Sequence, residues 1–388
     1  MYDFESRLNR KITGAVKWQA RNTKQEEYSE DIIPLSVADM EFKVMDEVKE
    51  ALHEAVDIYD PYGYQGCTEA YLESVCDWMR KRHHAEIEKE WIVTSDGVVD
   101  ALKRSVERFT NPGDGVIIFT PVYPPFFKAA ACNETRVLEC PLLNDHENYS
   151  IDFDTFEKLA QDPKTTMLLL CSPHNPVGRV YSREELNKIV SICKKNHLWL
   201  IADEIHHDLI LEGVSFTSML EYVKEYNHIV VCTSASKSFN LAGLKLSNIL
   251  IPDTDARNQY IGGDHFSINP FSMAATQCAY EKGERWLKEM MQVVKKNNEI
   301  CRQFFQEYFP KSSFPRLQGT YLMWINMNSY YANEDEMFED LYDVAKFVVN
   351  RGSTFGKEGM GYMRINLALP THLLEESLNR LKQLVEKK

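Results

Sequence analysis

The sequence predicts an α/β fold in which a mostly parallel β-sheet is covered by helices on both faces. Short apolar runs rich in β-branched residues recur along the chain, and helical periods lie between several of them. That alternation is typical of strands joined by crossover helices. The expected strands are Trp91–Thr94, Val116–Phe119, Met167–Cys171, Leu198–Ala202, Ile229–Thr233 and Leu246–Ile251. Helices are expected between them, for example at Val98–Arg108 and Arg183–Asn196.

The C-terminal part of the chain predicts a second, smaller layer. A long helix is expected from about Met273 to Tyr308, with Pro310 ending it. The pattern then predicts strand, helix, strand and helix, at Tyr321–Asn326, Glu336–Asn350, Tyr362–Leu369 and His372–Glu386. The first forty or so residues show no clear periodicity, and we expect them to pack against this part. The expected division is an N-terminal segment at 1–44, a large domain at 45–285 and a small C-terminal domain at 286–388.

Composition narrows the class of protein. The 388 residues are 44% hydrophobic and 26% charged, which is typical of a soluble globular chain long enough for two domains. The formal net charge of −14 disfavours nucleic acid and anionic membranes as partners. Met1–Glu5 carries no secretion signal, and the apolar runs are too short to span a bilayer. The nine cysteines form no Cys-x-x-Cys pair, which favours buried thiols in a reducing compartment such as the cytoplasm.

One lysine lies where a predicted strand leaves the core. Lys237 follows the apolar run Ile229–Thr233 within Ser234-Ala235-Ser236-Lys237-Ser238. An amine at this place can hold a carbonyl cofactor as an imine, which makes pyridoxal phosphate the first candidate. The alternative is a surface lysine on a serine-rich turn.

Chemistry-bearing residues also follow the other predicted strands. Ligands of open α/β sheets bind beyond the carboxyl ends of the strands, and a helix N-terminus there can hold a phosphate. Each residue has an ordinary alternative, such as a turn, a packing contact, a helix cap or a structural histidine. Five consecutive strand ends nevertheless favour one shared site. The residues are Gly97, Tyr123, Asn175, Asp203 with His206 and His207, and Lys237 with its flanking serines.

Ordered motifs across nearly the whole chain resemble fold-type I pyridoxal-phosphate enzymes, the aspartate aminotransferase superfamily. The broad resemblance is carried by Asn175-Pro176 with Gly178, by Asp203-Glu204 and by Ser236-Lys237. A narrower resemblance is to the cystathionine β-lyase, or C–S lyase, branch of MalY/PatB type. Its motifs are Lys11–Trp18, Val37–Phe42, Pro61–Gly66, Pro121–Phe126, Pro173–Val180, Asp203–Leu209 and Ser236–Leu244. The resemblance implies a large domain with a mostly parallel seven-stranded sheet and a smaller α+β domain.

The resemblance also implies roles for the matching residues. Lys237 would hold pyridoxal 5'-phosphate and move the substrate Cα proton, while Asp203 would pair with the pyridine N–H. Tyr123 would stack on the ring and also border the substrate. The remaining implied cofactor contacts are Asn175, His206, the backbone amides of Gly97 and Val98, and the hydroxyls of Ser234 and Ser236.

Further implied roles concern the substrate and a second subunit. Arg364 would grip the substrate α-carboxylate, a task that suits its bidentate fork. Trp18 and Asp39 would border the substrate side chain. Tyr64 would reach the cofactor phosphate of a neighbouring subunit, which implies a homodimer with shared sites. Lys245 stands where many relatives carry a phosphate-binding arginine, and it either neutralises the phosphate or faces solvent.

The implied activity is β-elimination that releases a thiol, pyruvate and ammonia from cystathionine, cysteine or related S-conjugates. An aminotransferase is the main alternative, because it shares the early steps. A partner-binding regulator on the same fold is a third possibility, although neither an extra DNA-binding domain nor loss of the lysine is seen. The sequence does not indicate which sulfur amino acid is the physiological substrate.

Overall fold

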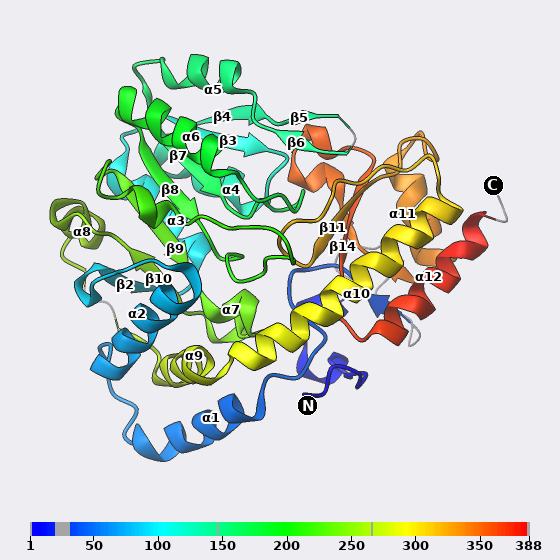
Figure 1. The fold of residues 1–388 in the computed structure, drawn as a ribbon, viewed down its shortest axis with the longest axis horizontal. Coiled ribbons are helices and arrows are strands. Elements are labelled where there is room, and N and C mark those ends of the chain that lie inside the picture. The colour runs from blue at the N-terminus through cyan, green and yellow to red at the C-terminus, as the bar shows by residue number, and fades with distance from the viewer. Residues whose placement is uncertain (1, 20–31, 146, 265–266, 386–388) are drawn as a thin grey trace.

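The computed structural model describes residues 2–19, 32–145, 147–264 and 267–385. Its centre is a seven-stranded sheet in the order β2-β10-β9-β8-β7-β3-β4 (Figure 1). Only β10 runs antiparallel to its two neighbours, so the predicted α/β fold with a mostly parallel sheet is confirmed. The strands are β2 (Ile92–Ser95), β3 (Gly115–Thr120), β4 (Arg136–Pro141), β7 (Thr165–Cys171), β8 (Trp199–Asp203), β9 (Ile229–Thr233) and β10 (Ser247–Leu250).

Helices cover both faces of this sheet, because successive side chains of a strand point to opposite faces. One face packs on α3 (Val98–Phe109), α4 (Pro125–Ala130) and α8 (Thr254–Ile261). The opposite face packs on α5 (Phe153–Ala160) and α6 (Arg183–Lys195). Within β7, for example, Leu169 is buried on the α3 side and Leu170 on the α6 side. Both faces of the sheet are therefore buried, and this packing holds the strand ends in fixed positions.

Three more helices and a short turn flank the end of the sheet formed by β2 and β10. The helices are α1 (Asp46–Ile58), α2 (Glu69–His83) and α9 (Pro270–Lys282), and the turn is α7 (Ala235–Ser238). Helix α9 packs against both α1 and α2. A small hairpin of β5 (Leu143–Asn144) and β6 (Tyr149–Ser150) lies at the other end of the sheet (Figure 1).

The C-terminal part forms a second, smaller unit of sheet and helices. A three-stranded sheet in the order β11-β14-β13 is accompanied by α10, α11 and α12 (Figure 1). The bounds are β11 (Leu322–Asn326), β13 (Asn350–Arg351), β14 (Tyr362–Asn366), α10 (Glu284–Tyr308), α11 (Glu334–Asp343) and α12 (Thr371–Val385). The N-terminal segment joins this part, because β1 (Ile33–Pro34) pairs in parallel with β12 (Phe347–Val348). None of the helices in the described ranges is long and apolar enough to cross a bilayer.

Two predicted helices were wrong in extent. The expected helix from Met273 to Tyr308 is divided between α9 and α10 at Gly283. A Cβ at Gly283 would lie 2.4 Å from the carbonyl oxygen of Ala279, so only glycine fits this bend. The expected helix to Asn350 ends at Asp343, because Lys346 takes a left-handed φ of 52° and short strands follow. Strand β4 was missed, because it lies at the sheet edge with much of its length exposed or half-buried.

Candidate active site

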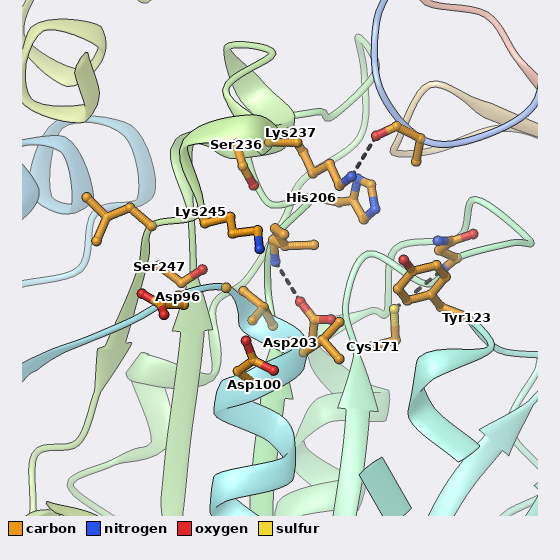
Figure 2. A pocket seen from close by; sticks show the side chains of 18 residues that line it. Asp96, Asp100, Tyr123, Cys171, Asp203, His206, Ser236, Lys237, Lys245 and Ser247 are labelled. Carbon is orange, nitrogen blue, oxygen red and sulfur yellow. Dashed lines mark hydrogen bonds between the residues drawn. The ribbon is translucent and has the colours of Figure 1, made fainter. Parts of the chain in front are cut away.

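A cavity of about 230 Å³ opens at the carboxyl ends of β7 and β8 and beside the turn that follows β9 (Figure 2). The structure brings eight of the predicted site residues to its wall. They are Gly97, Val98, Tyr123, Asn175, Asp203, His206, Ser236 and Lys237. Their sequence positions span 140 residues, and the parallel strands bring them together at one edge.

Lys237 lies in the single helical turn of α7 and extends into the cavity (Figure 2). Its Nζ donates a hydrogen bond to the carbonyl oxygen of Ala38 at 2.6 Å. Burial lowers the pKa of the amine to about 8, and the charge of Arg364 acts in the same direction. A substantial neutral fraction near physiological pH makes this amine a nucleophile, as imine chemistry requires.

Asp203 is the last residue of β8 and lines the same cavity. Its Oδ1 accepts a hydrogen bond from the backbone N–H of Ile205 at 3.0 Å. Burial raises the pKa of this carboxyl group to about 7, against the opposing effects of that hydrogen bond and of Lys237. A cationic N–H placed beside the carboxyl group would favour its ionised form.

The phenol ring of Tyr123 and the imidazole ring of His206 belong to residues that also line the cavity. The backbone N–H of Tyr123 donates to the carbonyl oxygen of Asn175 at 3.0 Å, which fixes the loop that presents the phenol ring. His206 is buried, and burial together with the charge of Lys237 holds its pKa well below the usual range. Its Nδ1 has no hydrogen-bond partner among the described residues. This neutral ring can therefore meet a ligand.

The N-terminus of α3 forms another wall of the cavity. Gly97 occupies the N-cap position with a φ of 144°, a conformation that L side chains rarely adopt. A Cβ at this position would meet no atom within 4 Å, so the backbone opens onto free space. The free N–H groups of Val98 and its neighbour suit an anion. Lys245 lines the same cavity, which favours the anion-binding alternative over a purely solvent-facing role.

Two carboxylates also line the cavity and offset part of this positive potential. Asp96 and Asp100 are both exposed and belong to the segment that begins α3 (Figure 2). The anion-binding capacity of this end therefore rests on oriented backbone N–H groups as much as on net charge.

Arg364 lies on β14 next to Asn175 of the cavity wall, and only 2% of its surface is exposed. Its two terminal nitrogens donate to the side-chain oxygens of Asn175 at 2.9 Å and of Asn350 at 2.7 Å. Its Nε is buried and has no partner among the described residues. Burial lowers the pKa of the guanidinium to about 10, which leaves it charged at neutral pH. A buried cation with spare donor capacity is a strong site for a carboxylate.

Asp39 and Trp18 belong to a charged cluster beside the site rather than to the cavity wall. Asp39 Oδ2 lies 2.7 Å from an Arg10 nitrogen, and Asp39 Oδ1 lies 3.4 Å from Lys17 Nζ. Burial alone would raise the pKa of Asp39, but these two cations outweigh it and the pKa is lowered. Trp18 Nε1 donates to Glu41 Oε2 at 3.3 Å. The cluster holds the segment whose Ala38 carbonyl meets Lys237.

Two further predicted residues lie outside the cavity wall. Ser234 is buried, and its Oγ donates to the carbonyl oxygen of Leu246 at 2.6 Å and accepts from the Ser236 N–H at 3.1 Å. It therefore anchors the turn that carries Lys237. Tyr64 is 99% exposed and contributes nothing to the cavity of its own chain.

Some site features had no recognised signal in the sequence. The Ala38 carbonyl is a backbone group, so no residue type marks it. Cys171 and Ser247 line the cavity, but they read as ordinary strand residues. Lys17 is buried between two carboxylates. Its place within the Lys11–Trp18 motif was the one available hint.

Comparison with known proteins agrees with this geometry. The family model "Aminotransferase class I and II" matches residues 30–381. Cystathionine beta-lyase PatB of Bacillus subtilis (strain 168) is 34% identical, with 98% of this chain and 99% of the relative covered. Protein MalY of Escherichia coli (strain K12) is 26% identical, with 97% of each chain covered.

Solved structures of pyridoxal-phosphate-bound proteins also resemble this chain over its whole length. Cystalysin from Treponema denticola, whose crystal structure contains pyridoxal 5'-phosphate, has a TM-score of 0.95 and 38% identity, covering 100% of this chain and 99% of that one. The pyridoxal-phosphate-bound C–S lyase from Staphylococcus hominis has a TM-score of 0.91 and 31% identity, with 100% of both chains covered. The chain is thus a member of the aminotransferase class I and II family.

Proposed function

We propose that this protein is a pyridoxal-phosphate-dependent carbon–sulfur β-lyase. The proposal rests on two residues on the wall of one cavity. The pKa of Lys237 is lowered there, and the pKa of Asp203 is raised. Pairs of groups whose environments shift their pKa values in this way are typical of catalytic sites. The cystathionine β-lyase and C–S lyase relatives support the reaction type.

The residues present fit the cofactor. The amine of Lys237 suits its aldehyde, and the carboxyl group of Asp203 suits its ring nitrogen. The open backbone at Gly97, with the α3 N-terminus and Lys245, suits its phosphate. Asn175 uses its side-chain oxygen to accept from Arg364, so its side-chain N–H₂ remains available to the ring oxygen.

The mechanism follows from what these side chains can hold and move. When bound, the cofactor supplies an electron sink that stabilises negative charge at the substrate Cα. Arg364 fixes the substrate carboxylate, which sets the angle of the Cα–H bond. Lys237 Nζ, once free, accepts the Cα proton as general base. Thiolate is a good leaving group, so a separate protein acid for Cβ–S cleavage is not required.

An aminotransferase is the second candidate, because the matching family model carries that description. Both reactions begin with the same proton transfer, and they differ in products. The decisive assay incubates the holoenzyme with cystathionine or cysteine without any keto acid. Pyruvate and thiol formed under these conditions support the lyase. Turnover that requires an added keto acid refutes it in favour of transamination.

A homodimer with shared sites is part of the proposal. Tyr64 is almost fully exposed, and Val56, Ile58 and Tyr62 nearby are also exposed. Such a cluster of apolar side chains is typical of a protein–protein contact. Tyr64 would then complete a cavity of the second subunit. Sedimentation that shows an active monomer would refute this arrangement.

The expected localisation, partners and domain boundaries are also proposals. We assign the protein to the cytoplasm with small amino-acid substrates and no nucleic-acid or membrane partner. All nine cysteines, each within the described ranges, are free thiols, which supports a reducing compartment. The domain division at 1–44, 45–285 and 286–388 can be tested by limited proteolysis at its two boundaries.

A further inference from the structure

A buried carboxylate is hydrogen-bonded to the turn that carries Lys237. Asp208 belongs to the segment after β8 and is 0% exposed. Its Oδ2 accepts a hydrogen bond from Ser238 Oγ at 2.6 Å. Ser238 is the residue that follows Lys237 and the last residue of α7. The carboxylate therefore contacts the turn that carries Lys237 without lining the cavity.

The other side of Asp208 is bound to α2. Its Oδ1 lies 2.8 Å from His83 Nε2 and accepts from Trp78 Nε1 at 3.1 Å. The Arg82 guanidinium lies 3.5 Å from the same oxygen and donates to the Asp208 backbone carbonyl at 3.1 Å. A buried charge is tolerated only with such a full set of partners. Asp208 thus ties the lysine turn to a fifteen-residue helix.

The two imidazoles beside Asp208 do not form a metal site in this arrangement. His83, His207 and Asp208 offer ligand atoms within 4.8 Å of one another. The two rings are stacked, however, with centroids 4.0 Å apart and planes at 16°. An ion coordinated in the plane of one ring would lie outside the plane of the other. Of the two imidazoles only His83 lies at hydrogen-bond distance from the carboxylate, whereas neither ring nitrogen of His207 has a hydrogen-bond partner among the described residues.

The lysine turn depends on anchors of this kind. Helix α7 has only four residues, and so short a helix has little stability of its own. Ser234 anchors its beginning through the Leu246 carbonyl, and Ser238 anchors its end through Asp208. These two bonds fix the direction in which the Lys237 side chain leaves the backbone.

We propose that Asp208 and Ser238 are positioning residues for Lys237, which hold its amine in the cavity and against the Ala38 carbonyl. Loss of the Ser238–Asp208 bond would let the turn shift without removing any group that contacts the ligand. The charged groups around the amine, which are Asp39, Asp203, Arg364 and Lys17, would all remain. The amine would become less enclosed, so its pKa should rise from about 8 toward its ordinary value.

The test compares Ser238→Ala and Asp208→Asn with Ser377→Ala. Ser377 is a matched control, because it is also buried and its Oγ donates to the Leu373 carbonyl in the remote helix α12. The first measurement is kcat and KM of the holoenzyme. The second is the pH dependence of acetylation of Lys237 in the apoprotein by acetic anhydride, read by mass spectrometry.

Ser238→Ala should lower kcat about tenfold with less than about a twofold change in KM, since the amine that accepts the Cα proton is misplaced rather than removed. The midpoint of Lys237 acetylation should move up by at least about half a pH unit. A variant that carries both substitutions should lose little more activity than Asp208→Asn alone, because both substitutions disturb the same Ser238–Asp208 hydrogen bond and Asp208→Asn also weakens the contacts with α2. Ser377→Ala should match the wild type in both measurements.

An unchanged kcat or an unchanged acetylation midpoint in Ser238→Ala overturns the inference. That variant decides the matter alone if Asp208→Asn does not fold. The inference rests on the proposed function of Lys237, and the two can fail separately. If borohydride places no cofactor on Lys237 of the wild type, the proposed function fails. If the label is present and Ser238→Ala behaves like wild type, only the positioning role fails.

Discussion

Replacing Asp203 by asparagine should stabilise the cofactor-free protein while impairing the cofactor-loaded enzyme. The side chain is 5% exposed, and burial raises its pKa from 3.8 to about 7. The folded protein therefore keeps a proton that the unfolded chain releases between about pH 4 and pH 7. The contribution of the protonated Asp203 to the free energy of unfolding is fully present below about pH 4. This contribution is lost as the pH rises through about 7. Asparagine has the same shape, can still accept from the Ile205 N–H and does not titrate.

The magnitude follows from the size of the shift. Roughly three pKa units at about 1.36 kcal/mol each give about 4 kcal/mol above pH 7. At pH 5 only about one pKa unit of this difference has accumulated, so the stability difference should be about 1–2 kcal/mol. The free energy of unfolding of the variant should exceed that of the wild-type apoprotein by these amounts.

The assay is urea unfolding of both apoproteins from pH 5 to pH 8 at one protein concentration, because the proposed homodimer would make stability concentration-dependent. Glu204→Gln is a useful control. Burial also raises the pKa of Glu204 to about 7, but this residue does not line the cavity. Both variants should show a pH-dependent stability difference, and only Asp203→Asn should lower kcat, by at least about 10²-fold. A stability difference that stays constant from pH 5 to pH 8 would refute the reasoning.

Three other predictions concern the proposed roles of single residues. Borohydride should fix the cofactor on Lys237, so Lys237→Ala should abolish the label, whereas a label on Lys245 would contradict the assignment. Arg364→Ala should leave the visible spectrum nearly unchanged and lower kcat/KM at least about 10²-fold, with only partial recovery in Arg364→Lys, and wild-type kinetics would exclude the carboxylate role. Tyr64→Phe should weaken cofactor retention by about 1–2 kcal/mol without dissociating the dimer in sedimentation, and unchanged retention would remove Tyr64 from the site.

The strand ends were predictable because their signals are local. Each central strand is a short apolar run, and the chemistry-bearing residue lies at its carboxyl end, as Asp203 does in β8, or within a few residues after it, as Lys237 does after β9. Parallel pairing then places those ends at one edge without further information. Eight of the residues implied by this reasoning line one cavity for that reason.

The misses depend on contacts between distant residues. The helix break at Gly283 arises from crowding against Ala279 and against the Phe239 ring, and Phe239 is 44 positions away in sequence. The Ala38 carbonyl meets Lys237 across 199 positions and has no side chain to announce it. Neither contact leaves a local pattern of composition or periodicity. Only the packed tertiary structure reveals them.

The dispersal of the site along the chain affects when it can form during protein synthesis. Lys237 is made 127 residues before Arg364, the cation that holds Asn175 beside the cavity. At about 5–20 residues per second, the ribosome needs roughly 6–25 s to cover that stretch. The lysine amine exists throughout this interval without the arginine and the strand that supports it. The arrangement in which Arg364 holds the Asn175 side chain can therefore be completed only after Arg364 has been synthesised, many seconds after Lys237.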